Sequence, residues 1–179
     1  MRLLGRWLLL AAGAALALQL FFIGRIALMA TIDPQSTAFQ RSEAWRLAQD
    51  GPLRWSQHWR DYDQIADTLK RAVIASEDDS FANHDGVDWE AMERAWERNA
   101  KAEQAAAARA EQNLPARAPK IRGGSTITQQ LAKNLLLSGE RSLLRKGQEL
   151  VLTFALERLL SKRRILEIYL NHVEWGIGV

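Results

Sequence analysis

The hydrophobic pattern begins with a long apolar run near the N-terminus. Residues 7–24 carry no charged side chain, and after Arg25 residues 26–32 are apolar again. A run of this length matches what one helix needs to cross a bilayer. The pattern therefore predicts a membrane-spanning helix, with residues 1–32 as an N-terminal transmembrane anchor.

The charges before this run predict its orientation. Arg2 and Arg6 precede it together with the amino terminus, and basic residues favour the cytoplasmic side of a membrane. We therefore expect a cytoplasmic N-terminus, with the chain beyond about Asp33 on the outer side. The alternative is a cleaved signal peptide, because Leu28-Met29-Ala30 is a passable cleavage site. The apolar run is longer than a typical signal core, which favours the anchor.

Residues 33–58 form a membrane-proximal segment. Asp33-Pro34 predicts an extended exit from the bilayer, since proline lacks an amide donor and biases its predecessor away from helix. A short helix is expected at 42–49, before the turn residues Asp50-Gly51-Pro52. Three tryptophans lie close to the anchor: Trp45, Trp55 and Trp59. They suit either the headgroup layer or packing beneath the following domain.

The next helical pattern leads to an acidic side chain. Ile65, Leu69 and Val73 recur at a spacing of four, and the next step reaches Glu77. We therefore expect the Glu77 carboxylate to point toward the core. Partial desolvation, with the negative end of the helix dipole, would raise its pKa toward that of a general base at neutral pH. The alternative is a fully solvated acidic cluster at the helix end.

The chain then turns at Asp85-Gly86 and enters a second helical pattern. Trp89, Met92 and Trp96 fall on one helical face and are expected to be core contacts. Residues 99–120 become rich in alanine and charge, which predicts a weakly packed insert, an exposed helix fraying into a flexible loop. Its excess of Lys and Arg suits lipid headgroups or a solvated linker equally well.

A glycine pair, Gly123 and Gly124, precedes a polar helix start. The pair allows close backbone approach, Ser125 can cap the helix, and the free amides there would suit an anion such as phosphate. The stretch is not a nucleotide P-loop, because no Gly-Lys-Ser/Thr follows. Gln129 and Lys133, four residues apart, would present an amide and a cation on one surface. A purely structural capped turn is the alternative.

Arg141, Arg145 and Glu149 share one helical face at successive steps of four. They form either a surface ion pair or a second cleft carboxylate among cations, able to hold a pyrophosphate or Mg²⁺. Beyond Glu149 the helix is apolar all round, as expected of a central buried helix. The amphipathic helix at 165–171 follows Lys162-Arg163-Arg164 and is expected to be scaffold, with its basic start facing the membrane or the cleft.

The amino-acid composition excludes several kinds of functional site. The chain has no Cys, so disulfides and thiolate sites are excluded, and its three His lack the close spacing of a His-ligated metal. The net charge of +3 is compatible with an anionic membrane surface but is too small to indicate nucleic acid.

Four stretches, in this order, resemble the peptidoglycan glycosyltransferase family. They are Glu77-Asp78 with Phe81, His84 and Gly86; residues 123–134; Arg145-Lys146 with Glu149; and Lys162 with Tyr169 and Asn171. The resemblance covers residues 59–179. One anchor, with no Ser-x-x-Lys of a transpeptidase, is similar to the monofunctional members. It implies a mainly α fold, a lysozyme-like helical head beside a small membrane-proximal lobe, on the outer side of a bacterial cytoplasmic (inner) membrane.

The resemblance also implies an activity, the polymerisation of lipid II into β-1,4-linked glycan strands with release of undecaprenyl diphosphate. Glu77 would be the catalytic base, and Glu149 the second acid, assisting at the donor diphosphate or at a divalent cation, Mg²⁺ or Mn²⁺. Residues that match the donor side are Ser125, Gln129, Gln130, Lys133, Arg141, Arg145 and Lys146. Residues that match structural positions are Asp78, Phe81, His84, Gly86, Gly123, Gly124, Asn134, Tyr169 and Asn171. No organic cofactor is implied.

The implied partners are lipid II, the growing lipid-linked glycan, the membrane and other cell wall synthesis or division proteins, with no nucleic acid. Family domains continue through further helices beyond the position of Val179, so the chain is expected to be a C-terminally truncated form. Two alternatives stay open, a lysozyme-like enzyme that cleaves glycan and an inactive anchored fragment. A diphosphate leaving group needs cations more than a protonating acid, which favours the transferase.

Overall fold

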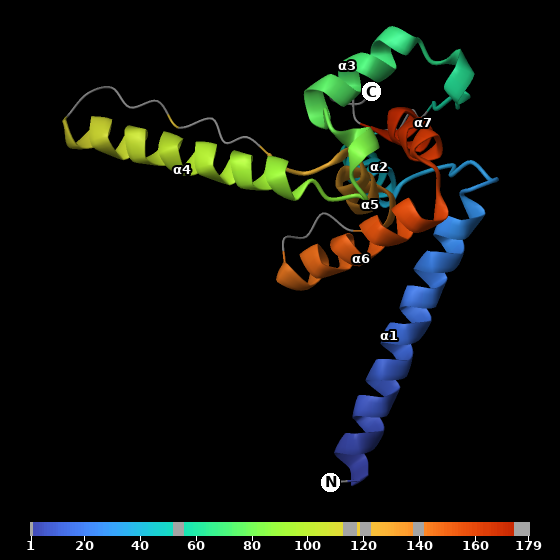
Figure 1. Ribbon diagram of the computed structural model, residues 1–179. Coiled ribbons are helices and arrows are strands. Elements are labelled where there is room, and N and C mark those ends of the chain that lie inside the picture. The colour runs from blue at the N-terminus through green and yellow to red at the C-terminus, as the bar shows by residue number, and fades with distance from the viewer. Residues whose placement is uncertain (1, 52–55, 113–117, 119–122, 138–141, 174–179) are drawn as a thin grey trace.

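The computed structural model describes residues 2–51, 56–112, 118, 123–137 and 142–173, and these ranges are mainly helical and contain no strand (Figure 1). This confirms the mainly α class. Two short 3-10 helices lie at Tyr62–Gln64 and Phe81–Asn83. The α-helices in chain order are α1 (Arg2–Leu28), α2 (Ala38–Asp50), α3 (Asp67–Glu77), α4 (Trp89–Glu111), α5 (Ile127–Leu136), α6 (Leu143–Leu159) and α7 (Lys162–His172).

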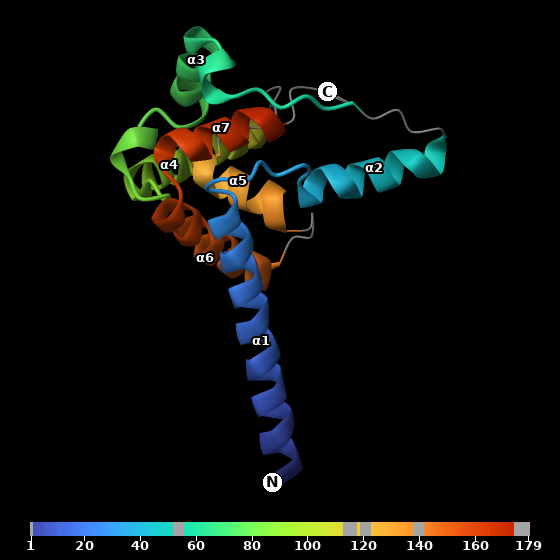
Figure 2. The ribbon, with the colours of Figure 1, turned by 90° about the vertical axis from the view of Figure 1, so that its right-hand side faces the viewer.

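The core lies where α5 packs between α6 and α7 (Figure 2). Each of these helices places aliphatic side chains at helical spacing on its inner face. The fully buried members are Ile127, Leu131 and Leu135 of α5, Leu152 and Leu156 of α6, and Ile165 and Ile168 of α7. Burying one such side chain contributes about 1.5–3 kcal/mol, so these three helices form the frame that positions the site.

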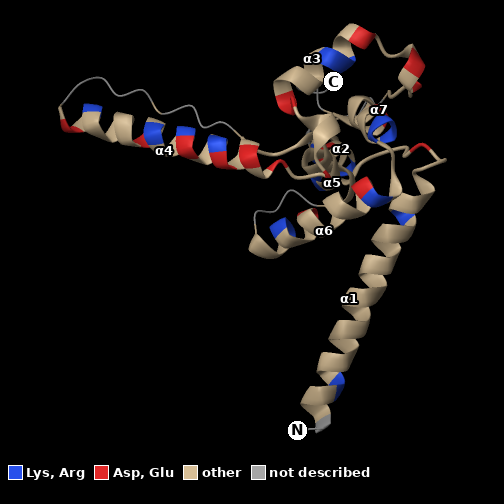
Figure 3. Ribbon diagram, viewed as in Figure 1, with Lys and Arg blue, Asp and Glu red and all other residues tan. Residues whose placement is uncertain are grey.

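Helix α1 runs away from this frame as a single long rod (Figures 1 and 2). Its residues Leu3–Leu28 are long and apolar enough to cross a membrane, and the most apolar part is wholly exposed. Figure 3 shows few charges along it. Only its last turns join the body, where Phe22, Ile26 and Met29 enter the hydrophobic core. The helix ends at Leu28, four residues before the end of the predicted anchor.

An amide pair joins the anchor to α6. Gln19 Nε2 donates to Gln148 Oε1 at 2.5 Å, and Gln148 Nε2 donates to Gln19 Oε1 at 3.0 Å. Each amide therefore satisfies the other inside an otherwise apolar surface, where an unpaired polar group is costly.

We expect Gln19→Leu to lower the free energy of unfolding by about 1 kcal/mol, because it leaves the Gln148 amide unpaired. Thermal unfolding of the full-length protein in detergent micelles measures this loss. Gln19→Leu with Gln148→Leu should be at least as stable as either single variant, since no polar group is then stranded. If the double variant instead lost the sum of the two single-variant losses in unfolding free energy, Gln19 and Gln148 would not be directly coupled.

The exit from the anchor is fixed to α7. Arg164 Nε donates to the Met29 carbonyl at 2.7 Å, and Arg164 Nη2 lies 2.7 Å from Asp33 Oδ1. His172 Nε2 donates to the Pro34 carbonyl at 2.9 Å, and burial lowers the pKa of His172, which keeps the ring neutral. The basic start of α7 thus binds the chain's own exit segment and does not line the cleft. That it faces the membrane stays a prediction.

The membrane-proximal helix is longer than predicted. Helix α2 begins at Ala38 instead of 42, because Thr37 and Gln40 form a capping box whose side chains bond each other's backbone amides at 2.9 and 2.8 Å. Trp59 packs against the core whereas Trp45 is exposed, and Trp55 lies outside the described residues.

Helix α4 corrects a second expectation. Trp89 and Trp96 are 60% and 77% exposed and Met92 is 36% exposed, so this face is not a core face. The buried residue is Ala95, because α4 projects from the body and touches it only near its start (Figure 1). The predicted insert is helical to Glu111, with alternating charges (Figure 3), and its end at 113–117 and 119–122 lies outside the described residues.

Helix α6 is buried on one face only. Leu152 and Leu156 are inaccessible, whereas Val151 and Phe154 remain 49% and 45% exposed. The helix is therefore not a central buried helix, because its second apolar face has no covering element among the described parts of the chain. Helix α1 packs beside α6 and leaves these two side chains exposed.

Candidate active site

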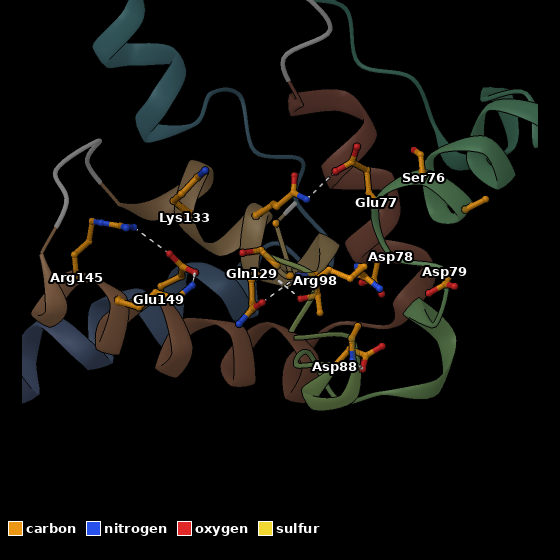
Figure 4. A pocket seen from close by; sticks show the side chains of 18 residues that line it. Ser76, Glu77, Asp78, Asp79, Asp88, Arg98, Gln129, Lys133, Arg145 and Glu149 are labelled. Atoms are coloured by element: carbon orange, nitrogen blue, oxygen red, sulfur yellow. Dashed lines mark hydrogen bonds and ion pairs between the residues drawn. The ribbon is translucent and has the colours of Figure 1, made fainter. Parts of the chain in front are cut away.

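One cavity of about 930 Å³ lies between the end of α3, the start of α4, and helices α5 and α6 (Figure 4). It gathers residues from three stretches far apart in the sequence. The predicted residues that line it are Glu77, Asp78, Gly123, Gly124, Ser125, Gln129, Gln130, Lys133, Arg145, Lys146 and Glu149. Acid and base side chains from these separate stretches therefore face one space.

Glu77 is the last residue of α3 and is exposed to this cavity. The expectation of a coreward, partly desolvated carboxylate is wrong. The buried face of α3 carries Lys70 and Val73, because the Lys70 ammonium lies 4.1 Å from the centre of the Tyr62 ring and donates to the Tyr62 carbonyl. The helix is thereby turned so that Glu77 points into the cavity.

Two side chains orient the Glu77 carboxylate. Gln130 Nε2 donates to Glu77 Oε2 at 3.0 Å, and the Tyr169 hydroxyl donates to Gln130 Oε1 at 3.0 Å. Burial, helped by the charge of Glu77, raises the pKa of Tyr169 to about 12, so its hydroxyl remains a donor. Tyr169 therefore fixes which end of the Gln130 amide faces the acid.

Asp78, the next residue, is buried and structural. Its Oδ1 accepts from His84 Nε2 at 2.9 Å, and its Oδ2 accepts from the Ile127 amide at 3.0 Å. The Gly86 amide donates to His84 Nδ1, which places the ring proton on Nε2. Asp78 thus links the end of α3, the following loop and the start of α5.

The start of α5 therefore holds an anion, but it is the chain's own Asp78. Thr126, rather than Ser125, is the N-cap, and it forms a capping box with Gln129. The expected phosphate site on these amides and the expected Ser125 cap are both wrong, because side chains already satisfy the amides of Thr126, Ile127 and Gln129.

The two candidate glycines of the site differ. A Cβ on Gly124 would lie 3.0 Å from Met92 Cα of α4, so this glycine permits the close approach that was predicted, whereas a Cβ on Gly123 would meet nothing within 4 Å. Gly86 has a φ of +92°, and a Cβ there would lie 2.7 Å from Thr153 Cγ2. Any side chain at Gly86 is thus excluded by both conformation and space.

The loop after α3 is held from α7. Lys162 Nζ donates to the His84 carbonyl at 2.6 Å, pairs with Glu157 at 2.8 Å and lies 4.5 Å from the centre of the Phe81 ring. Phe81 and His84 therefore shape the loop beside the cavity and do not line it.

The opposite end of the cavity is cationic around a buried acid. Glu149 is only 3% exposed, and its two oxygens lie 3.0 Å from Arg145 Nη1 and 2.5 Å from Lys146 Nζ. The Arg145 Nε is buried without a hydrogen-bond partner. Lys133 faces the same space and has no acidic partner among the described residues. The pair is thus a buried cleft group rather than a surface ion pair, and Arg141 lies outside the described residues.

A divalent cation at Glu149 stays a prediction. Both Glu149 oxygens are engaged by cationic side chains, and no cluster of three acidic or imidazole groups suited to a metal occurs in the described ranges.

Comparison with known proteins decides the family. A family model described as Transglycosylase matches residues 48–179, beginning ahead of the domain start predicted at 59. The chain belongs to the transglycosylase family.

Named relatives agree with this assignment. The chain is 51% identical, over 98% of its own length and 68% of the relative's, to "Biosynthetic peptidoglycan transglycosylase" of Burkholderia orbicola. Proteins with the same name from Paraburkholderia phytofirmans and Burkholderia pseudomallei are 51% and 54% identical, over 97% and 94% of this chain and 68% and 60% of their own lengths.

The transglycosylase cavity also contains residues that the sequence did not single out. Arg98 of α4 adds a cation, and Asp79 and Asp88 add acids, near Glu77 (Figure 4). Ala91, Ala95 and Arg98 share one helical face, and this stripe of small residues leading to a cation was the available signal. Asn134 and Asn171 lie outside the cavity, and Asn171 instead bonds the backbone of Arg60 at 2.8 and 2.9 Å.

Proposed function

We propose that this transglycosylase polymerises lipid II into β-1,4-linked glycan strands and releases undecaprenyl diphosphate. Peptidoglycan glycosyl transfer follows from the family and its named relatives. The observation that carries the finer proposal is one cavity with an exposed acid, Glu77, at one end and the cations Lys133, Arg145 and Lys146 at the other.

Glu77 would act as the general base. Its carboxylate faces the cavity, and the Gln130 amide holds one of its oxygens. The other oxygen is then oriented to accept a proton from the sugar hydroxyl that attacks the anomeric carbon of the donor. A direct attack of this kind inverts the anomeric centre, as the conversion of an α-linked lipid diphosphate to a β-1,4 bond requires.

The cationic end would stabilise the leaving group. As the anomeric bond breaks, negative charge accumulates on the diphosphate, and Lys133 is positioned to meet it because no carboxylate neutralises its ammonium among the described residues. Arg145 is held against Glu149 with its guanidinium partly buried, which fixes its direction. Glu149 would thus assist at the donor by positioning Arg145 and Lys146.

This division of charge favours transfer over lysozyme-like cleavage. Cleavage of a glycan needs a protonated acid at the leaving oxygen, whereas a diphosphate leaves without a proton when cations surround it. Both oxygens of the buried acid of this cavity, Glu149, are already engaged by cationic side chains, so neither is free to meet a leaving glycosidic oxygen.

The anchor would place this chemistry at a membrane surface. Helix α1 has the length and composition to span a bilayer, and the core contacts of Ile26 and Met29 bring the helical body directly against its outer end. We place the N-terminus in the cytoplasm and the cavity on the outer side of the cytoplasmic (inner) membrane. Association with other cell wall synthesis or division proteins stays a prediction.

The proposal is tested by incubating the full-length protein in detergent with fluorescent lipid II, with and without Mg²⁺. We expect glycan products that a muramidase digests, together with release of undecaprenyl diphosphate. Preformed sacculi should remain intact. Cleavage of sacculi without glycan formation would favour the lysozyme-like alternative, and neither product would favour an inactive anchored chain.

Removing the positive charge of Lys133 should slow the reaction with lipid II as donor. We expect Lys133→Met to lower kcat/KM for lipid II by about 10- to 100-fold, the value of one charge-assisted contact of 1.5–3 kcal/mol. Steady-state kinetics with fluorescent lipid II measures it. Lys101→Met, the same change on the exposed part of α4 outside the cavity, is the matched control and should leave kcat/KM within about twofold of wild type. Equal losses in both variants would contradict a specific donor contact.

A further inference from the structure

A second cavity lies where α1 ends and α2 begins. Its volume is about 280 Å³, and it shares no lining residue with the catalytic cavity. The wall includes two guanidinium groups, Arg25 and Arg41, beside Ser36, while Leu28 and Ile32 supply apolar surface. The site is therefore cationic on one side and apolar on the other.

One of the two guanidiniums is held in place by the exit segment. Arg41 Nη1 donates to both the carbonyl and the hydroxyl of Ser36, at 3.1 Å each. These bonds use only Nη1, so Nε and Nη2 remain available to a ligand. A guanidinium fixed in this way loses little side-chain freedom when it binds an anion.

The other guanidinium has no acidic partner in the part of the chain that the structure describes. Arg25 lies in the last turn of α1 and is half-buried, and its one described contact is with the Phe21 ring, 5.9 Å away. Asp33 lines the same cavity, but its carboxylate is already paired with Arg164 at 2.7 Å. Two uncompensated positive charges therefore share one small space and repel each other, and an anion between them would remove that cost.

The position of the cavity along α1 indicates the kind of anion. Arg25 precedes Leu28, the end of the apolar span, by three residues, which is about 4.5 Å along a helix. The cavity thus lies at the depth of lipid headgroups, and the exposed side chains of Leu28 and Ile32 extend from it along the apolar surface. A phosphate diester attached to acyl chains matches both sides of this wall.

We propose that this cavity is a binding site for the phosphate of an anionic phospholipid, held between Arg25 and Arg41. The inference depends on the membrane anchoring under the proposed function, but not on glycan synthesis. Since Arg41 belongs to α2 and Arg25 to α1, the bound headgroup would hold α2 against the end of the anchor at the membrane surface.

The test compares full-length wild type with Arg25→Gln/Arg41→Gln, each purified in detergent and titrated with phosphatidylglycerol or phosphatidylcholine. Native mass spectrometry counts the bound lipids. We expect wild type to retain one phosphatidylglycerol that the double variant binds at least tenfold more weakly, and phosphatidylcholine to bind both equally. Arg71→Gln/Arg109→Gln removes the same charge from exposed positions outside the cavity and should retain the lipid.

Two results would overturn the proposal. Equal phosphatidylglycerol retention by wild type and the double variant would show that the cavity is not the site. Displacement of phosphatidylglycerol by equimolar undecaprenyl diphosphate would assign the cavity to the lipid carrier instead. The single variant Arg41→Gln, outside the span, gives the same comparison should the double variant fold poorly. Glycan synthesis in detergent should be the same in wild type and both double variants, so a failure of the enzymatic proposal is recognised separately.

Discussion

Glu77→Gln should reduce glycan polymerisation by about 10³-fold, within the range contributed by a general base. The amide has the same shape as the carboxylate and can still accept from Gln130 Nε2, so the cavity keeps its form. It cannot accept the proton of the attacking hydroxyl. Because Glu77 is exposed and ends α3, the change should leave the thermal unfolding midpoint within about 2 °C of wild type.

The measurement is the initial rate of glycan formation from fluorescent lipid II by the full-length protein. The matched control is Asp85→Asn, the same carboxylate-to-amide change on an exposed turn outside the cavity, which should retain wild-type rates. A Glu77→Gln rate within threefold of wild type would refute the assignment of the base. Asp79 and Asp88, which line the same cavity, would then be the acids to test.

The features that the sequence predicted correctly depend on composition and short spacing. An uncharged run of this length predicts one long apolar helix, and α1 is such a helix, long and apolar enough to cross a membrane. The i, i+4 spacing of Arg145 and Glu149 was enough to predict their ion pair. Local rules of this kind need no knowledge of the partner element.

The errors arose where tertiary packing chose between two faces of a helix. Leu69 and Val73 defined an apolar stripe that led to Glu77, but α3 buries Val73 together with Lys70, whose ammonium reaches the Tyr62 carbonyl and ring, and leaves Leu69 and Glu77 exposed. The same limit applies to Trp96, whose helix projects from the body and has no core to face. Periodicity identifies a stripe, and only the packing partners decide whether it is buried.

Contacts between distant residues were also beyond the sequence. The Gln19–Gln148 pair joins positions 129 residues apart, and neither glutamine belongs to a motif. The Asp78 contact with the Ile127 amide spans 49 residues, and it replaced the phosphate expected at the start of α5. The N-terminal amides of α5 therefore bind the chain's own carboxylate, and the charge of a substrate would be bound by cationic side chains.

Asp78→Ala should be the most destabilising single change near the site. It removes a nearly inaccessible carboxylate, and the Ile127 amide and the His84 ring N–H both lose their acceptor. Two stranded donors at 1–3 kcal/mol each predict a loss of about 3 kcal/mol in the free energy of unfolding, or roughly 10 °C in Tm. Thermal unfolding of the full-length protein in detergent measures it, with Asp79→Ala as the exposed neighbouring control expected to shift Tm by less than about 2 °C.

The same variant separates the structural acid from the chemical one. Asp78 joins the end of α3, the loop around His84 and the start of α5, so its loss should loosen Glu77 of α3 relative to Gln130 and Lys133 of α5. Asp78→Asn keeps an acceptor for the Ile127 amide, so it should be more stable and more active than Asp78→Ala. Glu77→Gln, in contrast, should stay inactive although it keeps the shape of the side chain, because residue 77 takes the proton. If Asp78→Asn is instead as inactive as Glu77→Gln while its Tm is unchanged, Asp78 acts in the chemistry. Its link between α3, the His84 loop and α5 is then not its main role.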